Sequence, residues 1–292
     1  MRALVKPDLV AKDVYETCIS KVRNKALRKK LLEISDSIEA AELEYKEKSA
    51  EQTWFLIGSS DSVDGMVSKS EMEKVYTQRM VGQKSPGRHL YDKIKNSAPN
   101  GVCPLCGQRT VSTLDHFLPK SDFPSLVVLP LNLIPACSDC NKAKLDNVPS
   151  QGSEQTLHPY YDDVAHEQWL FAEVKESNPG YIVFYTSYVD VYDEVLNERI
   201  KFHFKELELG GLYMSNANST VTEIQFRLKK LHEKGGKMAV KAYLEEEEES
   251  RRENHVNSWH TAAYQAMMNS DWFCDGGFNT FKINFPLKFG WT

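Results

Sequence analysis

The fold of this chain turns on Cys103-Pro104-Leu105-Cys106 and Cys137-Ser138-Asp139-Cys140, two cysteine pairs of identical spacing. A C-x2-C pair suits a tight knuckle that directs both sulfurs at one point. Two such knuckles supply the four thiolates that close a tetrahedral zinc site. Turn-forming residues such as Gly107 and Asn141 lie beside the pairs and suit sharp local bends. We therefore predict a structural zinc ion held by Cys103, Cys106, Cys137 and Cys140.

Cysteine usage and the N-terminus favour reduced thiols over disulfides. The chain holds 292 residues and only six cysteines, which is not the pattern of a small secreted disulfide scaffold. Residues 1–7 lack the apolar core of a signal peptide. No apolar run is long enough to span a bilayer. We expect a cytoplasmic protein without membrane association, in which Cys18 and Cys274 are buried as small hydrophobic residues.

The segment between the knuckles predicts two short strands followed by a helix. Residues 111–114 form an apolar, β-prone run that leads into Asp115 and His116. Residues 132–135 lead into the second knuckle, and residues 141–145 have the composition of a helix start. Because zinc would join the two ends, we expect Asp115, His116 and Asn141 to lie close together.

Asp115 and His116 are the residue types that metal-assisted phosphodiester hydrolysis requires. This reaction needs an activated water and a cation at the scissile phosphate. A neutral imidazole accepts a proton from water near neutral pH, and a carboxylate suits Mg²⁺ or Mn²⁺. Consecutive strand residues point to opposite faces, so both side chains serve one site only if the strand bends before Pro119.

The whole pattern, C-x2-C … D-H … N-L … C-x2-C-N-x2-K, resembles the HNH nuclease superfamily with its ββα-metal fold and a four-cysteine zinc support. The resemblance covers residues 103–144 and neither flank. The run Leu114-Asp115-His116-Phe117-Leu118-Pro119-Lys120 is similar to HNH nuclease subunits of bacterial anti-phage systems, including Septu-like and retron-linked pairs. A defence complex with an ATPase partner is what this similarity implies.

The resemblance implies a role for each motif residue. Asp115 would bind the catalytic cation, Mg²⁺ or Mn²⁺, and His116 would be the general base. Asn132 would orient the base or brace the loop. Asn141 stands where the family often has His, so its amide oxygen would be the second ligand. The expected reaction is cleavage of duplex DNA with little sequence preference, leaving 5'-phosphate and 3'-hydroxyl ends.

The second cation ligand and the phosphate contacts have alternatives. His158, past the predicted helix, is either another metal ligand or second-sphere group, or a packed loop histidine. Three lysines are either contacts to the DNA backbone or solvated surface residues: Lys120, Lys142 and Lys144.

Charge alone does not mark the chain as a DNA-binding protein. The formal net charge is −5, whereas binding to a polyanion by charge favours a basic surface. Residues 21–30, however, contain six Lys or Arg side chains. This run is either a DNA or partner surface or the solvated face of a helix.

The sequence predicts three regions. A helical N-terminal region (1–96) precedes the nuclease domain (97–165). A mixed C-terminal region (166–292) follows and is expected to dock a partner or nucleic acid. Ser70 and Glu73 match a capping box, which predicts a helix over 71–81. Residues 88–96 predict a helix with Tyr91 and Ile94 inward. Apolar residues near the helical period predict N-terminal helices: Val14, Cys18, Val22, Leu27, Leu31 and Ile34.

In the C-terminal region, residues 169–174 and 181–185 predict a hairpin around Asn178-Pro179-Gly180. Residues 200–204 alternate and predict a strand. Helices are expected over 222–234, ending at Gly235-Gly236, and over 238–269, followed by a packed tail, 271–292. The fold class is therefore α+β: a ββα-metal core with zinc knuckles, flanked by a helical region and a mixed α/β region.

Three functions fit these features. The first is a metal-dependent DNA endonuclease. The second is the same nuclease, silent alone and delivered by a partner such as an ATPase subunit. The third, from another class, is a zinc-stabilised module that binds nucleic acid or protein without catalysis. The Asp115-His116 pair favours catalysis, because a pure scaffold does not need it.

Overall fold

The chain forms two compact units, residues 1–163 and 164–292. A computed structural model describes residues 1–144 and 147–282. Helices dominate, with small antiparallel strand pairs, so the α+β class is confirmed. The predicted regions 1–96 and 97–165 share one unit, because the N-terminal helices pack directly on the strand–loop–strand segment. Throughout the described residues, every helix is too short or too polar to cross a membrane.

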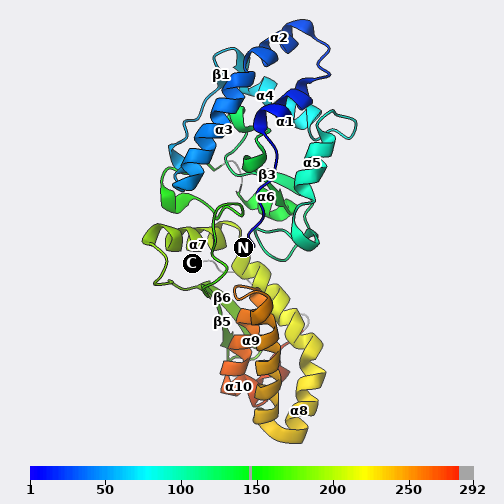
Figure 1. Cartoon of the computed structure of the whole chain (residues 1–292). Coiled ribbons are helices and arrows are strands. Elements are labelled where there is room, and N and C mark those ends of the chain that lie inside the picture. Colours follow the sequence, from blue (N-terminus) through cyan, green and yellow to red (C-terminus); the bar gives the residue numbers. More distant parts are fainter. Residues whose placement is uncertain (145–146, 283–292) are drawn as a thin grey trace. The chain divides into compact units, whose positions relative to one another are not determined.

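The N-terminal half of the first unit is helical, as predicted (Figure 1). Five of the six apolar residues of the helical pattern are buried, and Leu27 is half-buried: the five are Val14, Cys18, Val22, Leu31 and Ile34. Helix α1 packs on α3 and α4, and α3 and α4 reach the loop between the two central strands. The elements are α1 (Ala11–Ile19), α2 (Lys25–Glu33), α3 (Ser35–Ala50), β1 (Ser62–Val63), β2 (Val67–Ser68), α4 (Lys69–Arg79) and α5 (Arg88–Lys95).

The capping box of α4 lies two residues before the predicted one. The Ser68 hydroxyl accepts from the Glu71 amide, and the Glu71 carboxylate accepts from the Ser68 amide. Ser70 and Glu73 have the same spacing, but Ser68 ends β2 and is the extended residue that a cap requires. Helix α5 buries Tyr91 and Ile94, as expected.

The zinc-knuckle segment forms the predicted order of strand, loop, strand and helix. Strand β3 (Thr113–His116) pairs antiparallel with β4 (Leu133–Ala136), and α6 (Ser138–Lys144) follows. Asp115 lies opposite Ile134, and His116 lies opposite Leu133. Helix α6 begins three residues before residue 141, because the second knuckle is itself its first turn: the Asn141 amide donates to the Cys137 carbonyl at 3.1 Å.

The second unit contains the predicted hairpin and a helical layer. Strand β5 (Leu170–Lys175) pairs with β6 (Tyr181–Thr186), and helices α8 and α9 pack on it. The predicted strand at 200–204 is wrong, since these residues lie in α7 (Glu194–Glu206), whose N-cap Asp193 accepts from the Leu196 amide. Ile200 and His203, spaced by three, are both buried on one helix face, and a five-residue alternation does not separate that pattern from a strand.

Helical boundaries in the second unit also differ from those predicted. Helix α8 (Leu209–Asn254) begins earlier than residue 222 and breaks at Gly235 and Gly236, where Gly236 has φ +63°. The predicted helix over 238–269 ends at Asn254, because Asn257 instead bonds the Trp169 and Leu170 amides. Helices α9 (Trp259–Asn269) and α10 (Asp271–Cys274) follow.

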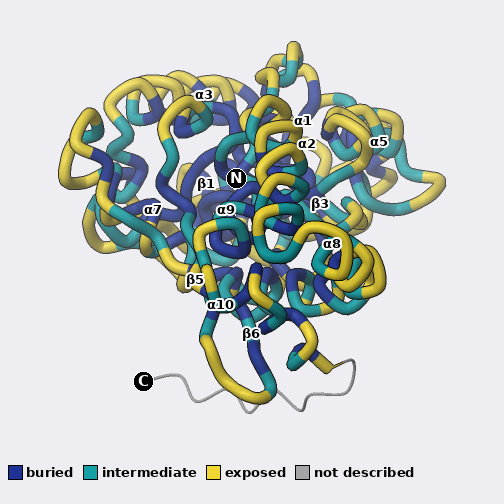
Figure 2. The backbone as a smooth tube through the Cα atoms, turned by 90° about the horizontal axis from the view of Figure 1, so that it is seen from below, coloured by how far each residue is buried: buried dark blue, intermediate teal, exposed yellow. Residues whose placement is uncertain are grey.

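Burial separates the packed interior from the outer helical turns. The outer turns of α3 and α8 are yellow in Figure 2, whereas strand β3 is mostly buried. The aromatic tail is core where it is described, since Phe273, Phe278 and Phe281 are buried. The rest of the predicted tail, residues 283–292, lies outside the described residues.

Candidate functional site

The four predicted zinc ligands converge. The Sγ atoms of the two knuckles all lie within 4.8 Å of one another, and all four residues are buried. Zn–S bonds of about 2.3 Å in a tetrahedron place the sulfurs about 3.8 Å apart, so this spacing fits a zinc ion. In residues 1–144 and 147–282, this is the one group of three or more His, Cys, Asp or Glu side chains close enough to share a metal. Its members are Cys103, Cys106, Cys137 and Cys140.

Backbone amides prepare both knuckles for negatively charged sulfur. The Arg109 amide donates to Cys106 Sγ, and the Cys140 amide donates to Cys137 Sγ, each at 3.4 Å. Gly107 has φ +65°, which a glycine adopts without strain and which closes the first knuckle. Such N–H···S bonds stabilise thiolates, which are the form that binds metal.

The four thiols are close enough to share protons. Hydrogen bonds among them raise the pKa of Cys103 and Cys140 and lower the pKa of Cys106 and Cys137. Four adjacent thiols therefore compete for protons, and a divalent cation that replaces those protons removes the conflict. We conclude that the cluster can hold a zinc ion.

His116 is held by the loop between the two strands. Its Nε2 lies 2.9 Å from the Val127 carbonyl oxygen. Because a carbonyl only accepts, Nε2 carries the proton and Nδ1 carries the lone pair in the neutral ring. Burial, opposed by the Val127 bond, lowers the pKa of His116 to about 3, so the ring is neutral at pH 7. The residue keeps 9% of its surface exposed, and the ring of Tyr76 from α4 packs against it edge-on at 4.4 Å.

Asp115 faces helix α6 and is paired with a lysine. Its Oδ2 accepts from Lys144 Nζ at 3.1 Å, and both side chains are about 7% exposed. The same ammonium donates to the carbonyls of His116 and Phe117. Burial raises the pKa of Asp115, although the Lys144 charge opposes the rise. Within β3 the two side chains leave on opposite faces, so Asp115 meets α6 and His116 meets the loop and α4. The expected bend follows the strand, at residues 117–118 just before Pro119.

Asn132 braces the loop and does not bond the base directly. Its Oδ1 accepts from the Leu118 amide at 2.8 Å, and its Nδ2 donates to the carbonyls of Leu118 and Leu126. Val127, which receives the His116 bond, is the next residue after Leu126. Asn132 is fully buried, so it fixes the loop that fixes the ring of His116.

The other predicted site residues on or near α6 differ in how deeply they are buried. Asn141 is half-buried on α6, one helical turn before Lys144 and on the same face. Lys142 is exposed and Lys120 is partly exposed, so both can reach a phosphate. The surface role expected for Lys144 is wrong, because three protein oxygens occupy its buried ammonium.

His158 is packed among aromatic rings. The residue is fully buried, and its ring lies 4.3 Å from Phe117 and stacks on Trp54 at 5.2 Å. Its Nδ1 accepts from the Tyr160 amide, and its Nε2 lies 3.0 Å from the Tyr45 hydroxyl. Both ring nitrogens therefore have protein partners, which favours the packed-histidine alternative over a metal ligand.

Lys144→Met tests the buried pair. It leaves the Asp115 charge buried without its partner, so we expect the free energy of unfolding to fall by about 3–5 kcal/mol. Burial already raises the pKa of Asp115, and loss of the lysine raises it further. The folded variant then binds a proton more tightly than the unfolded chain, so its stability falls as pH rises through that pKa.

Urea unfolding between pH 6 and pH 8 measures the loss in free energy of unfolding of Lys144→Met. Zinc stays bound, and no other metal is added. Lys142→Met is the matched control, because Lys142 is exposed on the same helix. Equal stability of the two variants at pH 8 would contradict a structural role for the Lys144 ion pair.

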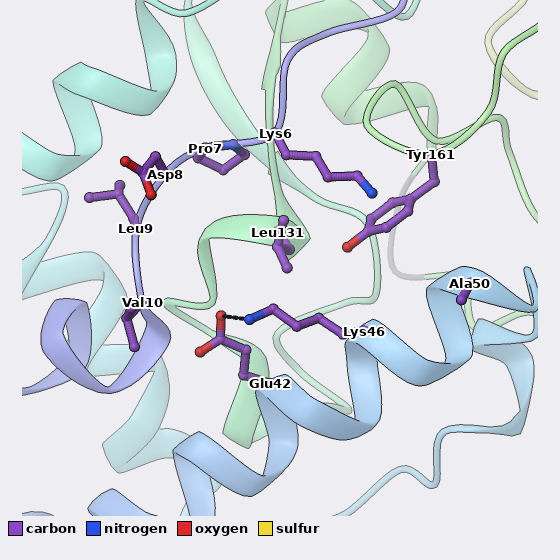
Figure 3. Close-up of a pocket in the computed structure, with 10 residues that line it drawn as sticks. All are labelled: Lys6, Pro7, Asp8, Leu9, Val10, Glu42, Lys46, Ala50, Leu131 and Tyr161. Atoms are coloured by element: carbon purple, nitrogen blue, oxygen red, sulfur yellow. Dashed lines mark ion pairs between the residues drawn. The ribbon is translucent and has the colours of Figure 1, made fainter.

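A separate cavity of about 410 Å³ lies on the first unit, between residues 6–10, α3 and Tyr161 (Figure 3). Three of its four charged side chains, Lys6, Glu42 and Lys46, already have partners. Glu42 is bonded by Lys46 at 2.8 Å and by the Ala11 amide at 3.0 Å, and Lys6 lies over the Tyr161 ring at 3.9 Å. Asp115 and His116 do not line this cavity, so the candidate site remains at β3.

Two contributors to the site were not expected from the sequence. Tyr76 is one, and the Val127 carbonyl is the other. A backbone carbonyl has no sequence signature. Tyr76 lies in a segment predicted as an ordinary helix, so no local pattern connects it with His116.

Comparisons with known proteins give one informative match. No family model matches the chain, and no solved structure matches it. The chain is 32% identical over 166 residues to protein ea31 of Escherichia phage lambda. The matched segment covers 56% of this chain and 56% of that protein. The chain therefore spans about half the length of the curated relative it matches, and it is related to a phage protein over that part.

Proposed function

We propose that this chain is a metal-dependent endonuclease of the HNH type that hydrolyses DNA phosphodiester bonds. The observation that carries the proposal is the bond between His116 Nε2 and the Val127 carbonyl, beside a buried aspartate. This bond leaves Nδ1 of the neutral imidazole as the proton acceptor. The four clustered cysteines lie on either side of the strand pair in sequence and would hold its two ends together through zinc. The motif spacing over residues 103–144 resembles that superfamily.

The roles follow from the contacts. His116 takes a proton from the attacking water through Nδ1. Lys144 holds Oδ2 of Asp115, so the other carboxylate oxygen and the Asn141 amide oxygen would hold Mg²⁺ or Mn²⁺, hard cations that accept few protein ligands. The bound cation would stabilise charge at the scissile phosphate. Asn132 positions the loop, and Lys120 and Lys142 are available to the DNA backbone.

The biological setting is a further part of the proposal. The run over residues 114–120 resembles nuclease subunits of anti-phage defence complexes, and the match to a phage protein supports a place in phage biology. We propose that an ATPase-type partner delivers the nuclease to DNA. The second unit, residues 164–292, carries no candidate catalytic residue and is available for such docking.

A non-catalytic zinc-stabilised binding module is the second candidate. The observation that favours it is the Asp115–Lys144 ion pair, because the lysine occupies an oxygen that a catalytic cation could use. In that case the ammonium replaces the cation and the core only supports a binding surface.

Cleavage of supercoiled plasmid by the purified zinc-loaded protein separates the two candidates. We expect nicked and linear products with Mg²⁺ or Mn²⁺ and none without added metal, since the cation stabilises the transition state. A labelled end assay should show 5'-phosphate ends. Metal-independent cleavage would contradict the mechanism. No cleavage with either metal, in the presence of the co-purifying partner, would favour the binding module.

A further inference from the structure

Six cations gather just before and along helix α2. Between residues 21 and 30 there is no acidic residue, and the chain as a whole carries −5. All six side chains are exposed. We call this group the α2 basic cluster: Lys21, Arg23, Lys25, Arg28, Lys29 and Lys30.

Two members of the cluster are placed where they do not help the helix. Lys25 and Arg28 lie in the first turn of α2, which has no acidic residue. The helix dipole is positive at that end, so cations there are unfavourable. Lys25 and Lys29 are also like charges at i and i+4, which repel. Folding alone would favour acidic or neutral residues at these positions.

Ion pairs within the chain do not explain the α2 basic cluster either. Lys29 lies 3.8 Å from Glu33, and both side chains are well exposed, so the pair contributes little. Within residues 1–144 and 147–282, no acidic side chain lies within ion-pair distance of the other five cations. The cluster is therefore open to an anionic partner.

Helices α1 and α4 connect the cluster with the candidate site. Helix α2 packs on α1, and α1 packs on α4. Tyr76, on α4, packs on the ring of His116 at 4.4 Å. The cluster and the candidate site thus belong to one unit and are linked through packed helices.

We propose that the α2 basic cluster binds the phosphate backbone of duplex DNA and holds it beside the candidate site. The choice of DNA rests on the proposed function, but the binding does not require cleavage. Duplex DNA carries one negative charge per about 1.7 Å of its axis, and unpaired Lys and Arg side chains gain affinity by releasing its counterions. Such contacts position a duplex without reading its sequence.

A second basic segment serves as the control because the helix itself explains it. Lys229 and Lys234 lie in the last turns of α8 before its break at Gly235. Cations are favourable at a helix C-terminus. Both side chains are exposed, as those of the α2 basic cluster are. Replacing both of them removes two positive charges, the same number as the double substitution in α2.

The test compares Lys25→Gln/Arg28→Gln with Lys229→Gln/Lys234→Gln. Anisotropy of a short labelled duplex is measured over a salt series, with zinc retained and no Mg²⁺ or Mn²⁺. At about 0.1 M salt we expect the α2 variant to bind on the order of tenfold more weakly, with a salt slope lower by about 2. Its melting temperature should stay the same or rise, because unfavourable charges are removed. The α8 variant should bind like wild type.

Three results would overturn the proposal: wild-type protein that does not bind the duplex, equal weakening in both variants, or displacement of DNA by polyglutamate as effectively as by unlabelled duplex. The last would assign the cluster to an acidic protein. The plasmid assay is independent, since a protein that binds through α2 but never cleaves would refute the proposed catalysis and leave the cluster assignment intact.

Discussion

Cys140→Ser is expected to abolish zinc binding and unfold the zinc-knuckle core. The substitution leaves three thiolates where four converge within 4.8 Å. Structural zinc sites contribute about 10–16 kcal/mol of apparent binding free energy, which is folding free energy where no site exists in the unfolded chain. Cys140 also lies in the first turn of α6, so its loss releases the helix that carries Lys144 and Asn141.

Zinc content and thermal unfolding measured together check this result. Cys274→Ser is the matched control, because Cys274 is buried in the second unit and outside the cluster. It makes the same chemical change and should keep the full zinc content. If Cys140→Ser retained stoichiometric zinc and wild-type stability, the four-cysteine site would be refuted.

His116→Ala is expected to reduce plasmid cleavage by about 10²–10⁴-fold, the range for loss of a general base. The zinc content should not change, since His116 does not belong to the cysteine cluster. The alanine also loses the bond to the Val127 carbonyl, so a loss of stability has to be separated from a loss of chemistry.

His116→Gln makes that separation, because its amide can still donate to the Val127 carbonyl but has no basic nitrogen. His89→Ala controls for the histidine change itself, since His89 is exposed on α5. We expect both His116 variants to be inactive, the Gln variant to melt close to wild type, and His89→Ala to cleave normally. An active His116→Gln enzyme would contradict the role of His116 as base.

The local features of the zinc core could be predicted because they depend on neighbours in sequence. Spacing of two residues places both sulfurs of a knuckle together, and a short β-prone run bounded by turns indicates β3. The same reasoning failed where two local patterns overlap. Residues 200–204 alternate like a strand, yet they belong to helix α7, and two Ser-x-x-Glu patterns compete to begin α4, of which the one at Ser68 wins.

The sequence by itself determined which candidate chemical groups this protein brings together: four cysteines in two knuckles, and an aspartate and a histidine between them. Only the tertiary structure decided how these groups are used. Lys144 meets Asp115 across 29 residues, and His158 meets Tyr45 across 113. Such pairs depend on which surfaces are buried together when helices pack on strands. No local spacing encodes that burial, so a lysine expected at the surface becomes an internal partner and a possible ligand becomes part of an aromatic core.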